Sequence, residues 1–294
     1  MATSAMQRPR RLAPIVQPGL FGIRTWKKTR LVLAIVMALI SVFPLLYMVS
    51  LAFQPVGEIL GSTPHLIPEH PTVQNFVQAW TENSFGRYFM NSVIVSLSTV
   101  VLTDVIASLA AFAFARYHFR LKEALFYFLL ASLAIPGIGI IIAQYLLMDK
   151  LHLLDSLGGL ILLYVASNLP FTIFLLRGFF ASIPKEYEEA FRLEGAGTLR
   201  VLTGLIVPLS LPALAVVSMF TFNAAWDEFV LALTLLNSQA HYTLPIGLSL
   251  FIGEHTTAWG AFFAACVIAT IPNLVIFLVT QRWFRRGISL GGLR

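Results

Sequence analysis

Acidic side chains occur inside long apolar stretches of this sequence, where a charge is costly and usually faces a protein interior or a wet cavity. Asp104 lies near the middle of one stretch, and Asp227 and Glu228 lie together toward the end of another. Carboxylates accept hydrogen bonds from hydroxyl groups, and the neighbouring Trp226 and Phe229 could stack on a sugar ring. All five are candidates for a solute path. The alternatives are a polar gate or subunit contact for the pair and a structural role for Asp104.

The sequence contains no motif for covalent catalysis, for metal binding or for nucleotide binding. The six histidines are scattered without metal-ligand spacing, and Cys266 is the single cysteine, so no internal disulfide or thiolate metal cluster can form. No Ser/His or Cys/His constellation supports an intramembrane enzyme. The phosphate-binding pattern G-x-x-x-x-G-K-[ST] is also absent. We therefore expect no catalytic site, no metal and no bound cofactor in this chain.

The composition indicates a chain that is mostly not solvated by water. Of its 294 residues 57% are hydrophobic and 12% are charged, whereas soluble domains are about a quarter charged. A helix needs about 20 apolar residues to cross a bilayer. The stretches of about that length are 31–53, 89–115, 124–148, 157–176, 205–236 and 259–284. They lack the alternation of a barrel, so the sequence predicts an all-α polytopic membrane protein with six transmembrane helices.

Helix-breaking residues interrupt three of these stretches, at Pro136–Gly137, at Asn168–Pro170 and at Pro272. Broken helices in transporters often line cavities, because the freed backbone carbonyls need partners. Simple kinks are the alternative. Asn168 therefore joins the candidates for a solute path.

The basic residues are strongly asymmetric along the chain. Of the 20 Lys and Arg residues, 18 fall in the N-terminal tail, the loops after the second and fourth stretches and the C-terminus, and only Arg87 and Lys150 fall on the other side. The positive-inside rule then places both termini in the cytoplasm and explains the net charge of +6 without nucleic acid. We expect a cytoplasmic tail, 1–30, that is neither a signal nor a transit peptide, and a membrane domain, 31–294.

The cytoplasmic segment 182–208 has the pattern of a short amphipathic helix followed by a sharp turn. Tyr187, Ala190 and Phe191 share one face, with Glu189 on a polar side, and Gly195 suits a helix end. A helix lying on lipid is one interpretation. Because its charge is mainly acidic, an anionic membrane surface would repel it. A protein partner is the better interpretation.

The same segment resembles the cytoplasmic motif of ABC importer permeases, E-A-A-x3-G-x9-I-x-L-P. Here the motif begins Glu189-Ala190-Phe191, continues to Gly195 and ends at Pro208, with its spacing kept throughout. It departs by Phe191 for alanine, Leu205 for isoleucine and Val207 for leucine. The resemblance implies that the segment is a coupling helix between the fourth and fifth spans. Its site residues would be Tyr187, Glu189, Ala190, Phe191, Gly195 and Pro208.

Further stretches resemble the carbohydrate-importer branch of that family, on the side of the second permease of maltose-type transporters. They are Asn75-Phe76, Asn91-Ser92, Leu169-Pro170-Phe171, Arg177 to Phe180 and Ala225 to Phe229, with Asp227 in place of asparagine. The resemblance implies half of a translocation path for a sugar or oligosaccharide. Glycerol phosphate or a polyol is the alternative solute. A stand-alone secondary transporter is less consistent with the sequence, because internal repeats are not evident.

The resemblance also implies a division of labour in a bacterial inner membrane. The partners would be a second permease, two ATPase subunits that bind ATP and Mg²⁺, and an extracytoplasmic solute-binding protein. The lack of an ATP-binding loop in this chain agrees with that division.

Overall fold

The computed structural model describes residues 20–61, 65–81, 84–252 and 258–291, and the side chains of 28–61, 65–81, 84–252 and 258–283. The chain divides into two units, Met1–Met48 and Val49–Arg294. Most of helix α1 (Leu20–Ala52) belongs to the first unit. Its apolar side chains, such as Leu31, Leu39 and Ile40, are exposed. Residues 20–30 of the predicted tail, 1–30, are helical and continue into the first apolar span, Lys28–Ala52. Residues 1–19 lie outside the described part, and the boundary of the tail stays a prediction.

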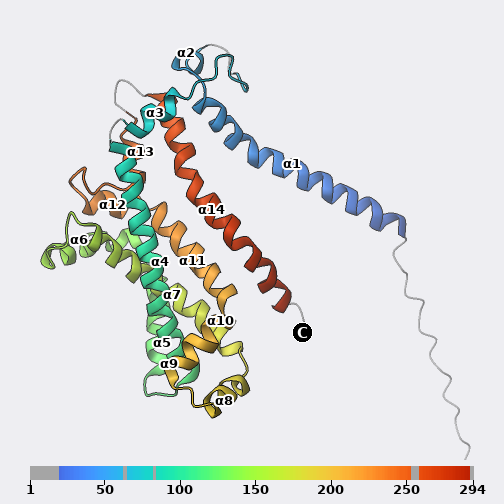
Figure 1. Cartoon of the computed structure of the whole chain (residues 1–294), viewed down its shortest axis with the longest axis vertical. Coiled ribbons are helices and arrows are strands. Elements are labelled where there is room, and N and C mark those ends of the chain that lie inside the picture. Colours follow the sequence, from blue (N-terminus) through green and yellow to red (C-terminus); the bar gives the residue numbers. More distant parts are fainter. Residues whose placement is uncertain (1–19, 62–64, 82–83, 253–257, 292–294) are drawn as a thin grey trace, which may run out of the picture. The chain divides into compact units, whose positions relative to one another are not determined.

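The second unit is built around four helices that pack lengthwise. They are α4 (Phe85–Arg116), α7 (Leu157–Ser182), α11 (Leu211–Trp226) and α14 (Trp259–Gly291). Helix α4 packs against α7 and α11, and α11 packs against α14, as Figure 1 shows. Short helices α2 (Val56–Ile59), α3 (Gln74–Thr81) and α13 (Leu244–Ser249) gather toward one end, and α12 (Val230–Leu235) lies farther along α4.

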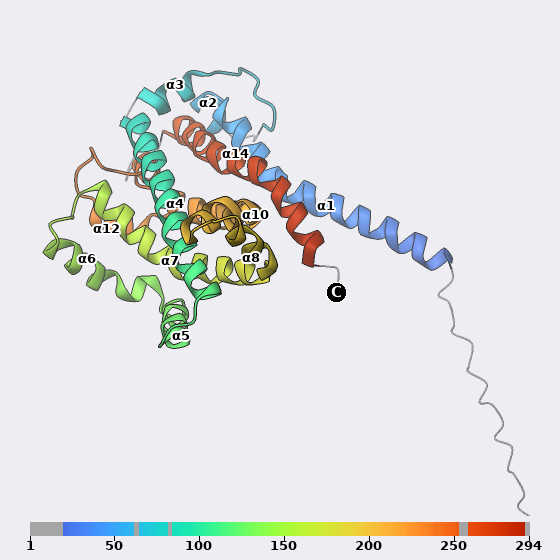
Figure 2. The same cartoon turned by 60° about the horizontal axis from the view of Figure 1, so that its bottom comes forward.

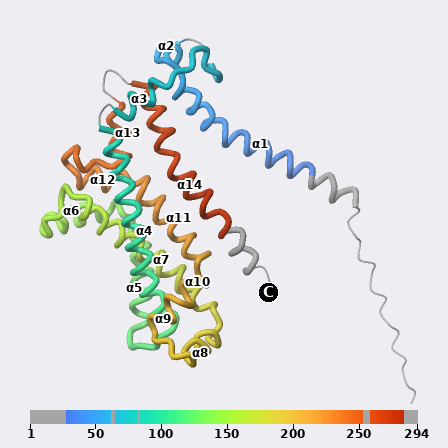
Figure 3. Tube along the Cα trace, viewed as in Figure 1, coloured from blue at the N-terminus to red at the C-terminus, as the bar shows by residue number. Residues whose placement is uncertain are grey.

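The other end of this unit carries the segment that the sequence marks as a coupling helix. Helix α8 (Lys185–Leu193) follows α7 and leads into α9 (Thr198–Val201), a π-helical turn (Leu202–Ile206) and α10 (Val207–Leu209). Figure 3 traces this path into α11. Within the second unit, the segment therefore lies at the far end of the long helices from α2, α3 and α13.

Two of the predicted spans are sharply bent. Helix α5 (Lys122–Ser132) is separated by a 3-10 turn (Gly137–Ile140) from α6 (Ile141–Lys150), and the two halves meet at 97°. Residues Thr198–Leu209 meet α11 at 81°. The described residues contain four helices long and apolar enough to cross a membrane, or up to six if each bent pair is one span. The exact number of six stays a prediction.

Proline acts differently at the three interruptions that the sequence indicates. The break at Pro136–Gly137 is confirmed by the bend between α5 and α6. At Pro170 and Pro272 the helices α7 and α14 continue through the prolines, so a break is excluded there and the simple kink that the sequence left open as an alternative remains. The predicted stretch 205–236 is also not one helix. It bends at Ser210 and ends its long helix at Trp226, and α12 begins only at Val230.

Candidate functional site

Helix α8 is fixed to the membrane helices by a buried ion pair. The guanidinium of Arg116, the last residue of α4, pairs with the carboxylate of Glu188, and these side chains are only 7% and 10% exposed. Arg116 Nη2 also donates a hydrogen bond of 2.8 Å to the carbonyl of Ile183, just before α8. A buried charge needs its partner, because the unpaired ion would carry the full cost of desolvation. The pair therefore ties the position of α8 to the end of α4.

The opposite side of α8 is open. Tyr187 is 57% exposed, Leu193 is 90% exposed, and Glu189 and Ala190 are exposed as well. Leu199 on α9, the helix that follows, is also exposed, at 66%. An acidic group among exposed apolar side chains suits a protein partner better than water alone.

Phe191 lies deeper than Tyr187 and Ala190, with which it shares the helical spacing of α8. Its ring is partly buried and packs on the cluster formed by α4, α7 and the 196–217 segment. A Cβ added at Gly204 would lie 3.3 Å from the Phe191 ring. The glycine therefore leaves the room that this bulky motif residue needs.

The turn after α8 depends on Gly195, as the sequence predicts. Gly195 has φ +84°, a conformation that residues with a Cβ rarely adopt. No atom lies within 4 Å of a Cβ built there, so the constraint is backbone conformation and not space. Pro208 lies within α10 and follows the π-helical turn, two residues before the bend at Ser210. Pro208 does not itself end α10, which continues to Leu209.

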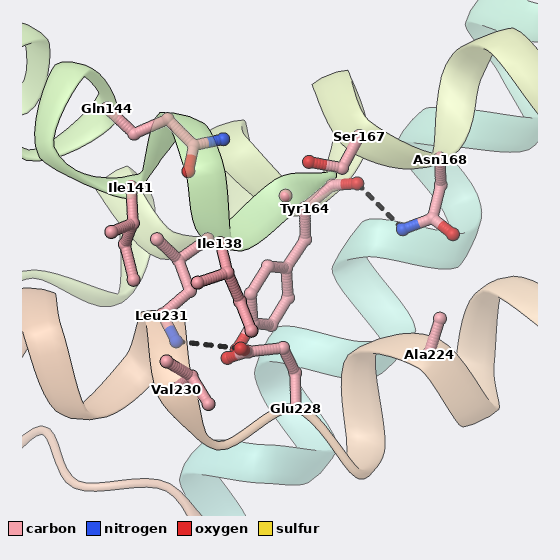
Figure 4. Close-up of a pocket in the computed structure, with 11 residues that line it drawn as sticks. Ile138, Ile141, Gln144, Tyr164, Ser167, Asn168, Ala224, Glu228, Val230 and Leu231 are labelled. Carbon is pink, nitrogen blue, oxygen red and sulfur yellow. Dashed lines mark hydrogen bonds between the residues drawn. The ribbon is translucent and has the colours of Figure 1, made fainter. Parts of the chain in front are cut away.

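A cavity of about 460 Å³ lies where the two broken spans meet α7 (Figure 4). Its polar lining comes from Gln144 on α6, from Tyr164, Ser167 and Asn168 on α7, and from Glu228 between α11 and α12. Helices α6 and α12 lie side by side at this point (Figures 1 and 2). Asn168 and Glu228, both candidates from the sequence, are thus brought together.

Glu228 is held firmly by three hydrogen bonds. Its carboxylate accepts from the Tyr164 hydroxyl at 2.6 Å and from the backbone N–H groups of Leu231 and Ala232 at 2.7 and 2.9 Å. The first turn of a helix has N–H groups without intrahelical partners, so Glu228 caps α12. Figure 4 shows the carboxylate beneath the Tyr164 ring, at the edge of the cavity.

Asp227 and Trp226 do not line this cavity, and both line a smaller one instead. Asp227 accepts a hydrogen bond of 3.2 Å from the Asn273 amide and lines a different cavity of about 240 Å³ beside α13 and α14. Trp226 is 2% exposed, its ring packs on Phe222, and its indole N–H donates to the Ala269 carbonyl. Trp226 lines the smaller cavity beside Asp227, but little of its ring is exposed, and its stacking on a sugar stays a prediction.

Phe229 and Asp104 also lie away from the larger cavity. Phe229 packs partly buried on the cluster around α7 and α12. Asp104 accepts a hydrogen bond of 2.5 Å from the Ser218 hydroxyl, which joins α4 to α11. Its other oxygen is buried and has no hydrogen-bond partner. Asp104 thus has a helix-packing contact that the sequence left open as an alternative.

Sequence reasoning missed the residues that hold the segment between α12 and α13. Asp155, in the loop before α7, accepts hydrogen bonds from the backbone of Ser238 and Asn237 and from the Ser238 hydroxyl. These hydrogen bonds, the one from the Ser238 backbone N–H above all, lower the pKa of Asp155 to about 2. Asn91 donates to the carbonyls of Ala240 and Tyr242 from the other side. Only the Asn91-Ser92 pair had stood out in the sequence, by resemblance.

Comparisons with known proteins agree with this architecture. Residues 105–290 match the family of binding-protein-dependent transport system inner membrane components. The permease protein of a diacetylchitobiose uptake system from Streptomyces coelicolor is 34% identical over 89% of this chain and 87% of its own length. The permease protein of a trehalose/maltose transport system from Thermococcus litoralis is 33% identical over 89% and 94%.

A solved structure shares the fold. A chain of a bacterial ABC transporter involved in the import of the acidic polysaccharide alginate superposes with a TM-score of 0.80, at 22% identity, over 92% of this chain and 100% of that one. The family match spans both bent pairs, α8 and the cavity. The chain belongs to the family of binding-protein-dependent transport system inner membrane components, the membrane-spanning permeases of ABC importers.

Proposed function

We propose that this chain forms half of the translocation path of an ABC importer for a sugar or oligosaccharide. Family membership carries the proposal, and the two permease relatives serve uptake systems for diacetylchitobiose and for trehalose/maltose. Family membership also argues against a stand-alone secondary transporter. The chain is not an enzyme, because in this family the ATPase is a separate subunit.

The exposed side of α8 is the proposed contact with that ATPase. Tyr187, Glu189 and Ala190 would enter a cleft of the ATP-binding subunit, with Glu189 facing a basic group. Gly195 would hold the turn and Phe191 the packing beneath it. The remaining proposed partners are a second permease, a second ATPase copy and an extracytoplasmic solute-binding protein. Two ATPase copies would bring the ATP and Mg²⁺.

Dependence on partners tests this function. We expect the purified chain alone to show no ATP hydrolysis and no solute accumulation, because it contains no phosphate-binding loop. Co-expression with the ATPase, second permease and binding protein should yield one complex whose ATPase activity rises when the binding protein is added. ATPase activity from the single purified chain would contradict the proposal.

Membrane orientation is a second expected result. Because 18 of the 20 basic residues fall on one side, we propose that both termini are cytoplasmic. Reporter fusions near residues 65, 150 and 250 should give an external signal, and fusions near 120 and 195 an internal one. An internal signal at 250 would overturn this map.

A further inference from the structure

The larger cavity has polar residues on one wall, and the only charge on its lining is negative. Among the described residues that line it, Glu228 is the only charged one; Gln144, Tyr164, Ser167 and Asn168 are neutral and the rest are apolar. No Lys or Arg is among the lining residues. A phosphate, sulfonate or carboxylate in this space would face a carboxylate with no cation from this chain to offset it.

Glu228 cannot readily turn away from such a solute. Three hydrogen bonds fix its carboxylate, two of them to the first turn of α12 and one to α7. A carboxylate that also accepts from a sugar hydroxyl gains a hydrogen bond, whereas a nearby anion meets like charge at a fixed position. Amides such as Gln144 and Asn168 both donate and accept, which suits hydroxyl and acetamido groups.

We propose that this cavity is a solute-contact subsite of the chain, and that it favours uncharged sugars over anionic ones, with Glu228 as the specificity-determining residue. The inference rests on the proposed function and narrows its solute class. It disfavours the glycerol phosphate alternative, and it separates this chain from a transporter of an acidic polysaccharide. Asn168, Ser167 and Gln144 would supply the neutral contacts.

The charge inside this cavity can be measured without knowing which solute is transported. In a Cys266→Ser background, Ser167→Cys puts one thiol on the exposed cavity wall. In the complete complex in proteoliposomes, we expect the cationic reagent aminoethyl methanethiosulfonate to react with it faster than the anionic sulfonatoethyl reagent. The rate ratio, normalised to a free thiol in solution, should be about tenfold or more. Glu228→Gln should lower that ratio about tenfold.

Two further variants make the result specific. Asp227→Asn removes the adjacent carboxylate, which lines the other cavity, and should leave the ratio unchanged. Glu228→Gln could also loosen α12. Gln144→Lys therefore adds a positive charge to the cavity wall at a residue of α6 that takes no part in the hydrogen bonds of Glu228. It should lower the ratio as Glu228→Gln does, and Gln144→Met should not.

The outcomes separate this inference from the proposed function. Binding-protein-stimulated ATPase activity of the parent complex tests the function, and its absence would refute it. If that activity is present but the ratio is near one, or does not change with Glu228→Gln and Gln144→Lys, the charge selectivity is wrong. If the thiol introduced by Ser167→Cys reacts with neither reagent, the cavity is closed and the subsite is overturned.

Discussion

Replacing Glu188 with alanine is expected to abolish ATP-driven uptake while the membrane helices still insert. The change leaves Arg116 buried without its partner, and removing one member of a buried ion pair costs about 3–5 kcal/mol. That is enough to release α8 from the end of α4, and ATP hydrolysis would no longer move the permease. The measurement is solute uptake and ATPase activity of the same reconstituted complex. Uptake should fall to background, whereas ATPase activity should lose its response to the binding protein.

A matched control lies on the same helix. Glu186→Ala removes an exposed carboxylate from α8 and should leave uptake near the parent rate. Exchanging the two charges, in the double variant Arg116→Glu and Glu188→Arg, should restore part of the uptake that each single change removes. Normal uptake by Glu188→Ala would show that the ion pair does not hold the coupling helix.

Replacing Gly195 with valine is expected to have a comparable effect for a different reason. A β-branched residue is a genuine outlier at φ +84°, and the left-handed conformation costs about 1–2 kcal/mol even for an ordinary residue with a Cβ. The turn between α8 and α9 should therefore open and move the exposed face of α8 away from its partner. We expect loss of uptake and loss of the ATPase subunit on purification.

The second glycine of this turn supplies the control. Gly197 has φ −72° and ψ 168°, an extended conformation open to all residues, and like Gly195 it has no atom within 4 Å of a built Cβ. Gly197→Val should therefore retain most of the uptake and the ATPase subunit. Equal losses at the two positions would mean that surface contact, and not the left-handed backbone, explains Gly195.

The coupling segment was predictable because local rules determine most of it. Helical periodicity located α8, and the glycine after it indicated its end, both of which need only neighbouring residues. Periodicity did not reveal which acidic residue faces inward. Glu188 is buried because Arg116 comes from a helix far earlier in the chain, and no local pattern contains that partner.

The acidic pair Asp227 and Glu228 shows where reasoning from neighbouring residues fails. Asp227 and Glu228 are adjacent in sequence, so one shared site was the natural prediction. Yet α11 ends at Trp226 and α12 begins at Val230, and the two side chains turn to different cavities. Neither glycine nor proline marks this break. The cap comes from the Glu228 side chain itself, a contact that sequence patterns do not distinguish from a surface charge.

The long apolar helices could be located from the sequence, but their bends could be predicted only in part. Pro136–Gly137 coincides with a 97° bend, whereas Pro170 and Pro272 sit inside continuous helices. Proline removes one backbone donor wherever it occurs. Whether the helix then breaks depends on neighbours that pack around it, and those are set by the tertiary fold.

The Phe191–Gly204 contact has a consequence for building chimaeric permeases. The ring lies so close to Gly204 that a Cβ there would be only 3.3 Å away, a contact that the ring could accept only by shifting. Transplanting α8 alone into a scaffold with a larger residue at the position of Gly204 would place the ring in filled volume. The reverse graft, with alanine at position 191, would leave a hole beneath the helix. The portable module is therefore α8 together with the segment through Gly204, exchanged as one block.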